Sequence, residues 1–284
     1  MNFGAALFSF LSLLLLGDSL WSSGLAASRT VVFSEKIADS PGTLMLVPAV
    51  KTAGNGASAT LIGPALGRVE VPEGKELFLV VSPEGASRLA CLRLLKAGDL
   101  RRLRLHDVPV SESVLNNVVL LPGLEDLDLS KTDLSDRDLA VLSKIGTLKK
   151  LDLSGTLLHG SGLKRLAALK NLIDLDVDSN RLGNDSISVL TSALPALQIL
   201  DLSSTSITDA GVALLPRLKH LTKLRLNHCD ITDRCMVDLA KIKTLEKVNL
   251  TGTEASPDGL RRLQAALPAL HIEWKDKRRK RHRP

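Results

Sequence analysis

A leucine pattern that returns every 24 or 25 residues restricts the fold of this chain more than any other feature of its sequence. Each instance is a pair of apolar residues separated by one position, and such regular recurrence indicates a repeat architecture. The pairs are Leu103/Leu105, Leu127/Leu129, Leu151/Leu153, Leu175/Val177, Leu200/Leu202, Leu224/Leu226 and Val248/Leu250. A unit this short cannot bury its own leucines, so stacked neighbours must supply the core. The period therefore predicts a solenoid.

Each leucine pair sits in a longer frame with fixed flanking positions. Another leucine precedes each pair by three residues, and a mostly polar residue follows each pair by three. The following residues are Val108, Thr132, Thr156, Asn180, Thr205, Cys229 and Thr253. This frame, L-x-x-L-x-L-x-x-N/C/T, resembles the leucine-rich repeat family over residues 100–274. In that frame the following residues are expected to point inward and bond loop backbone that would otherwise be unsatisfied.

The second half of each repeat is similar to the short 24-residue class of this family, in which Thr-Asp or Ser-Asp opens a helix. The segments ITDAGVALLPRL (207–218) and ITDRCMVDLAKI (231–242) carry the likeness. The class is known in bacterial repeat proteins and, in related form, in ubiquitin-ligase adaptors. The resemblance implies a bacterial-type secreted protein with a curved solenoid and binding as its usual activity. It carries over no catalytic residues.

The stereochemistry of the repeat supports the same architecture. Alternate side chains of a strand lie on one face, so each leucine pair points to one side of a short strand. Ser135, Thr208 and Thr232 precede the helical half of their repeats and are expected to cap those helices. We therefore expect an α/β fold: a right-handed leucine-rich-repeat solenoid, shaped as a horseshoe. It should have a parallel concave sheet and convex helices, plus a small β-rich N-terminal segment.

The chain divides into four segments. Residues 1–27 contain an apolar run, Phe3–Leu16, followed by small residues, which predicts a secretory signal peptide. Residues 28–74 are rich in Val, Gly and Pro and are expected to form short strands. Residues 75–274 form the repeat domain, with a degenerate cap repeat at 75–99 and seven repeats at 100–274. Residues 275–284 are expected to be a disordered basic tail.

Both ends of the chain leave alternatives open. The apolar run is shorter than the ~20 residues of a membrane span, which favours an extracytoplasmic protein, periplasmic or secreted, or membrane-anchored if the run is not cleaved. The tail holds seven Lys or Arg and one Asp, so it carries the whole net charge of +6. Residues Lys275–Arg283 either contact an anionic surface, reach the solenoid as an intramolecular ligand, or only aid solubility.

The non-leucine strand positions are expected to display a concave surface that is acidic in the middle and basic at both ends. The residues expected to bind a partner are Arg102, Arg104, Asp126, Asp128, Asp152, Asp174, Asp176, Asp178, Asp201 and Arg225. They predict docking of a basic or mixed-charge ligand, although Leu-Asp-Leu-Ser is also a common filler of this repeat. A metal site is not expected, because the aspartates lack a recognised loop spacing.

No catalytic constellation stands out. His106 is expected to neighbour Ser130 and Asp128 across two strands, but nothing supplies an oxyanion hole or a closed pocket. A Gly-rich phosphate loop is absent from the sequence, so no cofactor or small-molecule substrate is expected. The predicted function is a monomeric, non-enzymatic recognition scaffold that binds a protein through the concave face. The alternative is an envelope-tethered structural protein whose basic tail binds an anionic surface.

Overall fold

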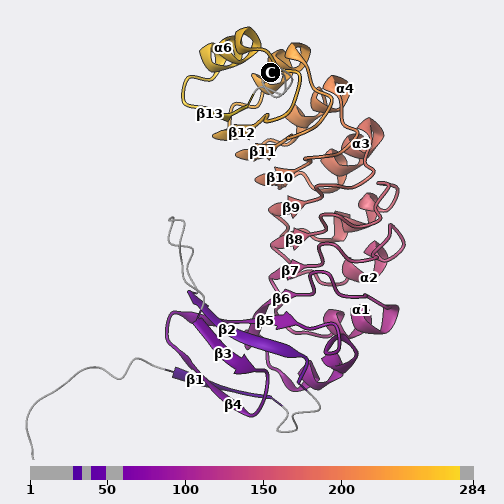
Figure 1. Ribbon diagram of the computed structural model, residues 1–284, viewed down its shortest axis with the longest axis vertical. Helices are drawn as coiled ribbons and strands as arrows, with labels where there is room; N and C mark the ends of the chain where they lie inside the picture. The colour runs from indigo at the N-terminus through magenta and orange to yellow at the C-terminus, as the bar shows by residue number, and fades with distance from the viewer. Residues whose placement is uncertain (1–27, 34–39, 49–59, 276–284) are drawn as a thin grey trace, which may run out of the picture.

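The computed structural model describes residues 28–33, 40–48 and 60–275, which form a curved stack of short strands with helices along its outer side (Figure 1). One 11-stranded sheet runs through the stack in the order β13-β12-β11-β10-β9-β8-β7-β6-β5-β2-β3. From β5 to β13 neighbouring strands are parallel. The predicted α/β solenoid with a parallel concave sheet is therefore confirmed.

The parallel strands follow the leucine pattern. Their bounds are β5 (Lys75–Val81), β6 (Leu100–Arg104), β7 (Asp126–Asp128), β8 (Lys150–Asp152), β9 (Asp174–Asp176), β10 (Ile199–Asp201), β11 (Lys223–Arg225), β12 (Lys247–Asn249) and β13 (His271–Glu273). The register aligns the first leucine of each pair with its equivalent in the next strand, as Leu151 with Leu175. These leucines are 0–1% exposed along the stack, so they form one continuous core.

Helices occupy the convex side, and most are short. They are η2 (Ala86–Leu94), α1 (Glu112–Val119), α2 (Leu139–Leu142), η3 (Leu163–Ala168), α3 (Asn184–Ala193), α4 (Asp209–Val212), η4 (Leu215–Arg217), η5 (Asp233–Cys235), α5 (Met236–Leu239) and α6 (Pro257–Ala266), where η marks a 3-10 helix. Each buries an apolar stripe against the sheet, such as Leu139 and Leu142 in α2.

The polar residues that follow each leucine pair by three positions bond backbone carbonyls, as the repeat frame predicts. The hydroxyls of Thr132, Thr156, Thr205 and Thr253 each donate to the carbonyl three residues earlier, at 2.6–2.8 Å. Asn180 donates its amide to the carbonyls of Leu153 and Val177 at 2.8 and 3.2 Å. Buried carbonyls at the strand ends are thereby satisfied, which fixes where each strand turns toward the convex side.

The expected helix caps are only partly correct. Thr232 accepts a hydrogen bond from the backbone N–H of Arg234 at 3.2 Å. Thr208 makes no such bond to its own helix, and Ser135 donates its hydroxyl to Asp138 at 2.7 Å. The prediction fails for these two residues because each hydroxyl is engaged elsewhere. Thr208 Oγ1 accepts from the side-chain amide of Asn184 at 2.9 Å, and Ser135 turns its hydroxyl toward Asp138, which also accepts the backbone N–H of Ser135 at 2.8 Å.

The preceding repeat supplies several of the missing acceptors. Asp209 accepts the backbone N–H and the hydroxyl of Thr232 at 2.9 and 2.7 Å, and the same arrangement recurs one repeat later. Asp136 accepts three backbone N–H groups from residues 159–162 at 3.0–3.2 Å. Carboxylates thus fasten each helix-side loop to the repeat before it, with bonds that are stronger than those to neutral acceptors.

The segment before the repeats is made of β-strands. Strand β1 (Ser28–Val32) pairs antiparallel with β4 (Arg68–Pro72) in a separate two-stranded sheet. Strand β2 (Gly42–Pro48) pairs antiparallel with both β5 and β3 (Thr60–Pro64), so this hairpin extends the solenoid sheet beyond its first parallel strand.

The two ends of the chain are not part of this description. The predicted signal peptide (1–27) and the tail beyond Lys275 lie outside the described residues. Within the described ranges, the helices are all too short or too polar to cross a bilayer.

Candidate binding surface on the concave sheet

Three columns of side chains line the concave surface, because residues two apart share a face and the strands are in register. The first column holds Phe78, Arg102, Asp126, Lys150, Asp174, Ile199, Lys223 and Lys247. The central column holds Arg104, Asp128, Asp152, Asp176, Asp201, Arg225 and Asn249. The third column, just past the strand ends, holds His106, Ser130, Ser154, Asp178, Ser203, Asn227 and Thr251. All the residues predicted to bind a partner therefore lie on one surface.

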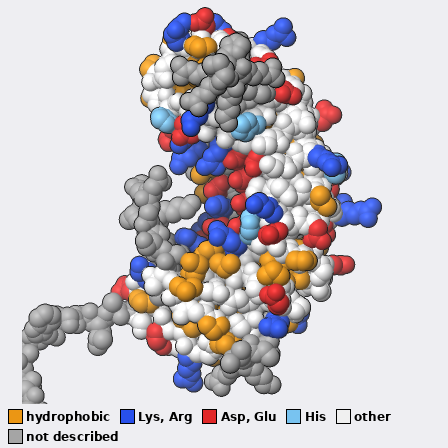
Figure 2. Space-filling model, viewed as in Figure 1, with side chains coloured by type: hydrophobic (Ala, Val, Ile, Leu, Met, Phe, Trp, Pro, Cys, Tyr) orange, Lys and Arg blue, Asp and Glu red, His pale blue; other side chains and the backbone are white. Residues whose placement is uncertain are grey.

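In the central column an arginine lies at each end of the run of aspartates. Arg104 Nε lies 2.8 Å from Asp128 Oδ2, and Arg225 Nη1 lies 3.1 Å from Asp201 Oδ2. Among the described residues, no Lys, Arg or His nitrogen lies within 4.0 Å of the carboxylates of Asp152 or Asp176. Figure 2 shows the result: acidic side chains gather in the hollow of the molecule, with basic groups above and below them.

In the middle of the central column, ionisation of the aspartates is disfavoured. Burial raises the pKa of Asp176 to about 7, with further contributions from Asp201, Asp152 and Asp178, while the backbone N–H of Asp178 opposes the rise. At Asp128 burial also disfavours the charge, but hydrogen bonds from Ser130 and the charge of Arg104 lower the pKa overall. The two carboxyls differ because Asp128 accepts hydrogen bonds from Ser130 and has Arg104 beside it, whereas Asp176 has other carboxylates around it, with Asp178 in place of the serine.

The third column changes character at β9. In the motif Asp-x-Ser, Ser130 and Ser154 donate their hydroxyls to Asp128 and Asp152, the latter at 2.7 Å. In the next repeat Asp178 replaces the serine. From there on, Asp178 Oδ1, Ser203 Oγ and Asn227 Oδ1 are buried with no hydrogen-bond partner in the described part of the chain. Sequence reasoning placed only Asp178 of these three in the site. A departure from Asp-x-Ser marks Asp178 and Asn227 in the sequence, whereas Ser203 keeps the motif and carries no such signal.

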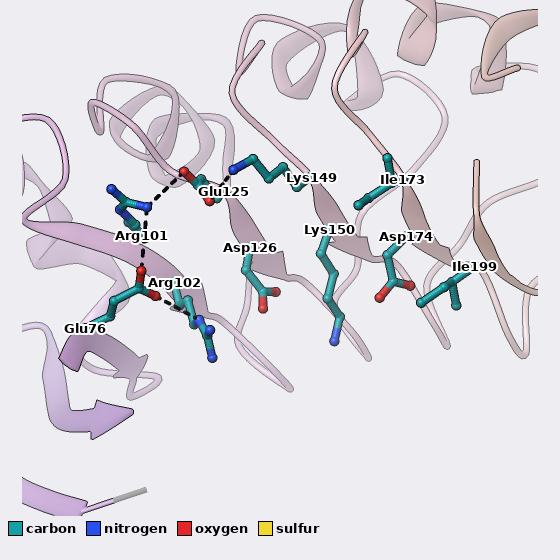
Figure 3. A pocket seen from close by; sticks show the side chains of 10 residues that line it. All are labelled: Glu76, Arg101, Arg102, Glu125, Asp126, Lys149, Lys150, Ile173, Asp174 and Ile199. Atoms are coloured by element: carbon teal, nitrogen blue, oxygen red, sulfur yellow. Dashed lines mark hydrogen bonds and ion pairs between the residues drawn. The ribbon is translucent and has the colours of Figure 1, made fainter. Parts of the chain in front are cut away.

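A hollow of about 330 Å³ adjoins the first column near β6 to β10. Figure 3 shows its lining, in which a chain of ion pairs links Glu76, Arg101, Glu125 and Lys149 along one side. At its far end Ile173 and Ile199 replace the charged residues of their columns, and both are half-buried.

All three predicted arginines already have partners within the chain, Arg225 through its pair with Asp201. Arg102 Nε lies 3.5 Å from Glu76 Oε2, and the guanidinium of Arg104 lies 5.1 Å from the centre of the Phe78 ring while it pairs with Asp128. These arginines therefore offer less free charge to a ligand than the sequence suggests.

The structure brings His106, Ser130 and Asp128 together, but not in a catalytic order. His106 Nδ1 lies 2.7 Å from Ser130 Oγ, and the same hydroxyl donates to Asp128. The serine is therefore the middle member, and its proton is held by a carboxylate whose pKa is lowered. A lowered pKa makes that carboxylate a weak base, so this cluster lacks the histidine-centred relay of a hydrolase. The described residues hold no group of three or more His, Cys, Asp or Glu arranged to bind a metal.

Comparison with known proteins agrees with this geometry. A leucine-rich repeat family model matches residues 194–215 and 217–240. This chain therefore contains leucine-rich repeats and is similar to bacterial proteins of that family. The crystal structure of internalin C2 from Listeria monocytogenes is similar to it with a TM-score of 0.52 and 26% identity, covering 70% of this chain and 80% of internalin C2. An internalin F structure from the same organism has a TM-score of 0.47 and 18% identity, covering 69% of this chain and 57% of that one. No curated protein matches the leucine-rich repeat protein in sequence.

Proposed function

We propose that this leucine-rich repeat protein is a non-catalytic scaffold that binds a basic segment of a protein partner on its concave face. The observation that carries the proposal is the central column, where Asp152 and Asp176 lie side by side without a basic neighbour in the described chain. Like charges on adjacent strands reduce stability. A partner that supplies positive charge relieves this repulsion, which favours complementary docking.

The surface supports a polar interface with one apolar contact point. Ile173 and Ile199 interrupt the charged columns beside the acidic middle, so a partner can place an aliphatic side chain there. The face otherwise lacks the aromatic anchors that dominate tight interfaces. Binding should therefore weaken strongly as ionic strength rises, because exposed charge pairs are screened by salt.

Site-specific photo-crosslinking in the native host tests the proposal. A photo-reactive residue at Lys223, on the concave face, should capture a protein partner, whereas one at Val237, which is 68% exposed on the convex side, should not. Replacing both Asp152 and Asp176 by Lys should remove the concave adduct while circular dichroism shows an intact fold. Equal capture from both faces, or capture that survives the double replacement, would refute concave-face binding.

The location of the scaffold is part of the same proposal. We place it outside the cytoplasm, because Phe3–Leu16 and the small residues after it resemble a secretory signal. Amino-terminal sequencing of the native protein by cell fraction is the test. A start near Ala27 in an extracytoplasmic fraction supports export, and an intact Met1 in the membrane fraction supports the tethered alternative. An intact Met1 in the cytoplasm would overturn this location.

A further inference from the structure

The strongest unassigned feature is a set of unsatisfied oxygens on the concave floor between β9 and β10. Ser203 is only 5% exposed, and its hydroxyl has no hydrogen-bond partner in the described chain. On the neighbouring rung of the third column, Asp178 Oδ1 is also buried and unpartnered. Buried polar atoms are normally hydrogen-bonded, so atoms that are not call for a physical explanation.

The rest of the third column shows that this state is specific to one place. Ser130 and Ser154 occupy equivalent positions, and both hydroxyls are satisfied by the aspartate two residues earlier. Ser203 has the same aspartate in Asp201, which accepts the backbone N–H of Ser203 and the guanidinium of Arg225 but not the hydroxyl of Ser203. The serine hydroxyl of the Asp-x-Ser motif thus bonds its aspartate in two repeats, but the hydroxyl of Ser203 does not.

We propose that the floor between β9 and β10 is a guanidinium-binding site, in which Asp176, Asp178, Asp201 and Ser203 receive an arginine side chain of the protein partner. The site deepens the proposed function and rests on it. Asp176 and Asp201 lie opposite each other in the central column, and Asp178 and Ser203 lie opposite each other in the third. The site is thus a patch formed by two neighbouring strands, with one residue of each strand in the central column and one in the third column.

The size of this patch favours a guanidinium over a metal ion. Adjacent strands lie about 4.8 Å apart and residues two apart on a strand are about 6.6 Å apart. Calcium requires six or more oxygens within about 2.6 Å, and the described residues contain no such acidic group. A guanidinium presents five N–H donors in a rigid plane and binds carboxylates in paired fashion.

The chain already uses guanidinium groups on this column. Arg104 closes one end on Asp128, and Arg225 closes the other on Asp201. In the described structure no such group pairs with Asp152, Asp176 or Asp178, whereas Asp201 already shares one oxygen with Arg225. A third guanidinium placed there supplies donors to the unpartnered oxygens after small side-chain rotations. It also supplies the positive charge that the neighbouring carboxylates lack.

The direct test is a ¹H–¹⁵N nuclear magnetic resonance titration of the full-length chain with the peptide acetyl-Gly-Arg-Gly-amide. We expect saturable shifts centred on the amides of Asp178 and Ser203, at least tenfold weaker binding of the citrulline peptide, and several-fold weaker binding of the lysine peptide. Citrulline keeps the shape of arginine without its charge. Equal binding of arginine and citrulline, or shifts centred elsewhere, would overturn the site.

Two matched variants locate the effect. Asp178→Ser installs the residue found at Ser130, Ser154 and Ser203, so it preserves the local fold, and it should weaken arginine-peptide binding at least fivefold. Asp185→Asn removes one exposed carboxylate from α3 of the same repeat and should leave binding unchanged. Equal losses in both variants would reduce the effect to overall charge and refute the site. Calcium shifting the same amides at lower concentration than the peptide would also refute it.

Two further arms separate the possible occupants and the two proposals. The first experiment uses a variant of the full-length chain in which the arginines at 278, 279, 281 and 283 are replaced by Ser. Unchanged peptide binding by this variant supports an arginine of the partner as the occupant. Peptide binding that appears only in this variant assigns the site to the chain's own tail and overturns our choice of occupant. Peptide binding that fails while concave crosslinks persist refutes the guanidinium site and leaves the scaffold standing. Peptide binding that persists without concave crosslinks supports the site and removes the scaffold.

Discussion

Replacing Asp176 by Asn should make the protein more stable, and more so as the pH rises. Burial and the neighbouring carboxylates raise the pKa of Asp176 from 3.8 to about 7 in the folded chain. The folded state therefore holds this proton more tightly than the unfolded state does. The stabilising contribution of the proton is fully present below pH 3.8 and is lost as the pH rises through about 7. Asparagine has no charge to develop over this range.

The size of the effect follows from the pKa difference. Each pH unit between the two pKa values corresponds to ~1.4 kcal/mol, so full ionisation at pH 8 costs ~4 kcal/mol as an upper limit. Solvent reaches the open groove and screens the charges, which reduces the cost to ~2 kcal/mol. About 40% of the gap is crossed by pH 5, so the advantage of the D176N variant should grow by ~1–2 kcal/mol from pH 5 to pH 8.

Urea unfolding followed by circular dichroism at both pH values measures this difference. Asp185→Asn is the control, since it removes an exposed carboxylate in the same repeat, and the effect of D176N is compared with it at each pH. The reasoning fails if D176N has the same effect at pH 5 and pH 8, or if it destabilises the chain at pH 8. Either result would mean that Asp176 is ionised in the native protein without cost.

Three further predictions concern the stability and reactivity of the repeats. Asp136→Ala removes the acceptor of three backbone N–H groups in the next repeat and should cost ~2–3 kcal/mol in urea unfolding; a loss below ~0.5 kcal/mol, the size of an ordinary surface change, would contradict this role. Gly162→Ala places a Cβ 2.4 Å from the carbonyl oxygen of Asp136, so the unfolding midpoint should fall. An unchanged midpoint would show that the loop shifts freely. Burial raises the pKa of the Cys229 and Cys235 thiols. Both thiols should therefore resist alkylation by iodoacetamide at pH 8 until the protein is denatured, which mass spectrometry measures. Alkylation of either thiol in the native protein would contradict their burial.

The period of the leucines was sufficient to predict the strands, their parallel order and the columns of the concave face. This works because one structural unit is copied, so a residue's position in the frame determines which neighbours it meets. The inward bonds of Thr132 and Asn180 were predictable for the same reason. The acidic middle of the face also followed directly from the sequence.

The interactions between columns could not be read from the frame. Arg102 pairs with Glu76 across columns, next to the point where the register of β5 with β6 shifts between Leu77 and Phe78. Identical motifs also diverge: Ser130 and Ser154 donate their hydroxyls to the aspartate two residues earlier and Ser203 does not, although Asp128 and Asp201 are both paired with an arginine. Such differences depend on which of several nearby donors bonds each carboxylate, and that depends on side-chain geometry.

The capping aspartates give the solenoid a direction. Asp136 and Asp209 each hold the loop of the following repeat, so a repeat that emerges later from the ribosome meets its acceptor already in place. Growth by addition at the carboxyl end therefore leaves these loop amides satisfied at every stage. Loss of the carboxyl-terminal repeat returns these aspartates to water, which solvates carboxylates well, but it also frees strand amides such as the N–H of Leu226, which donates to the carbonyl of Asn249. The side-chain contacts of Asp136 and Asp209 therefore favour addition of repeats in the order of synthesis.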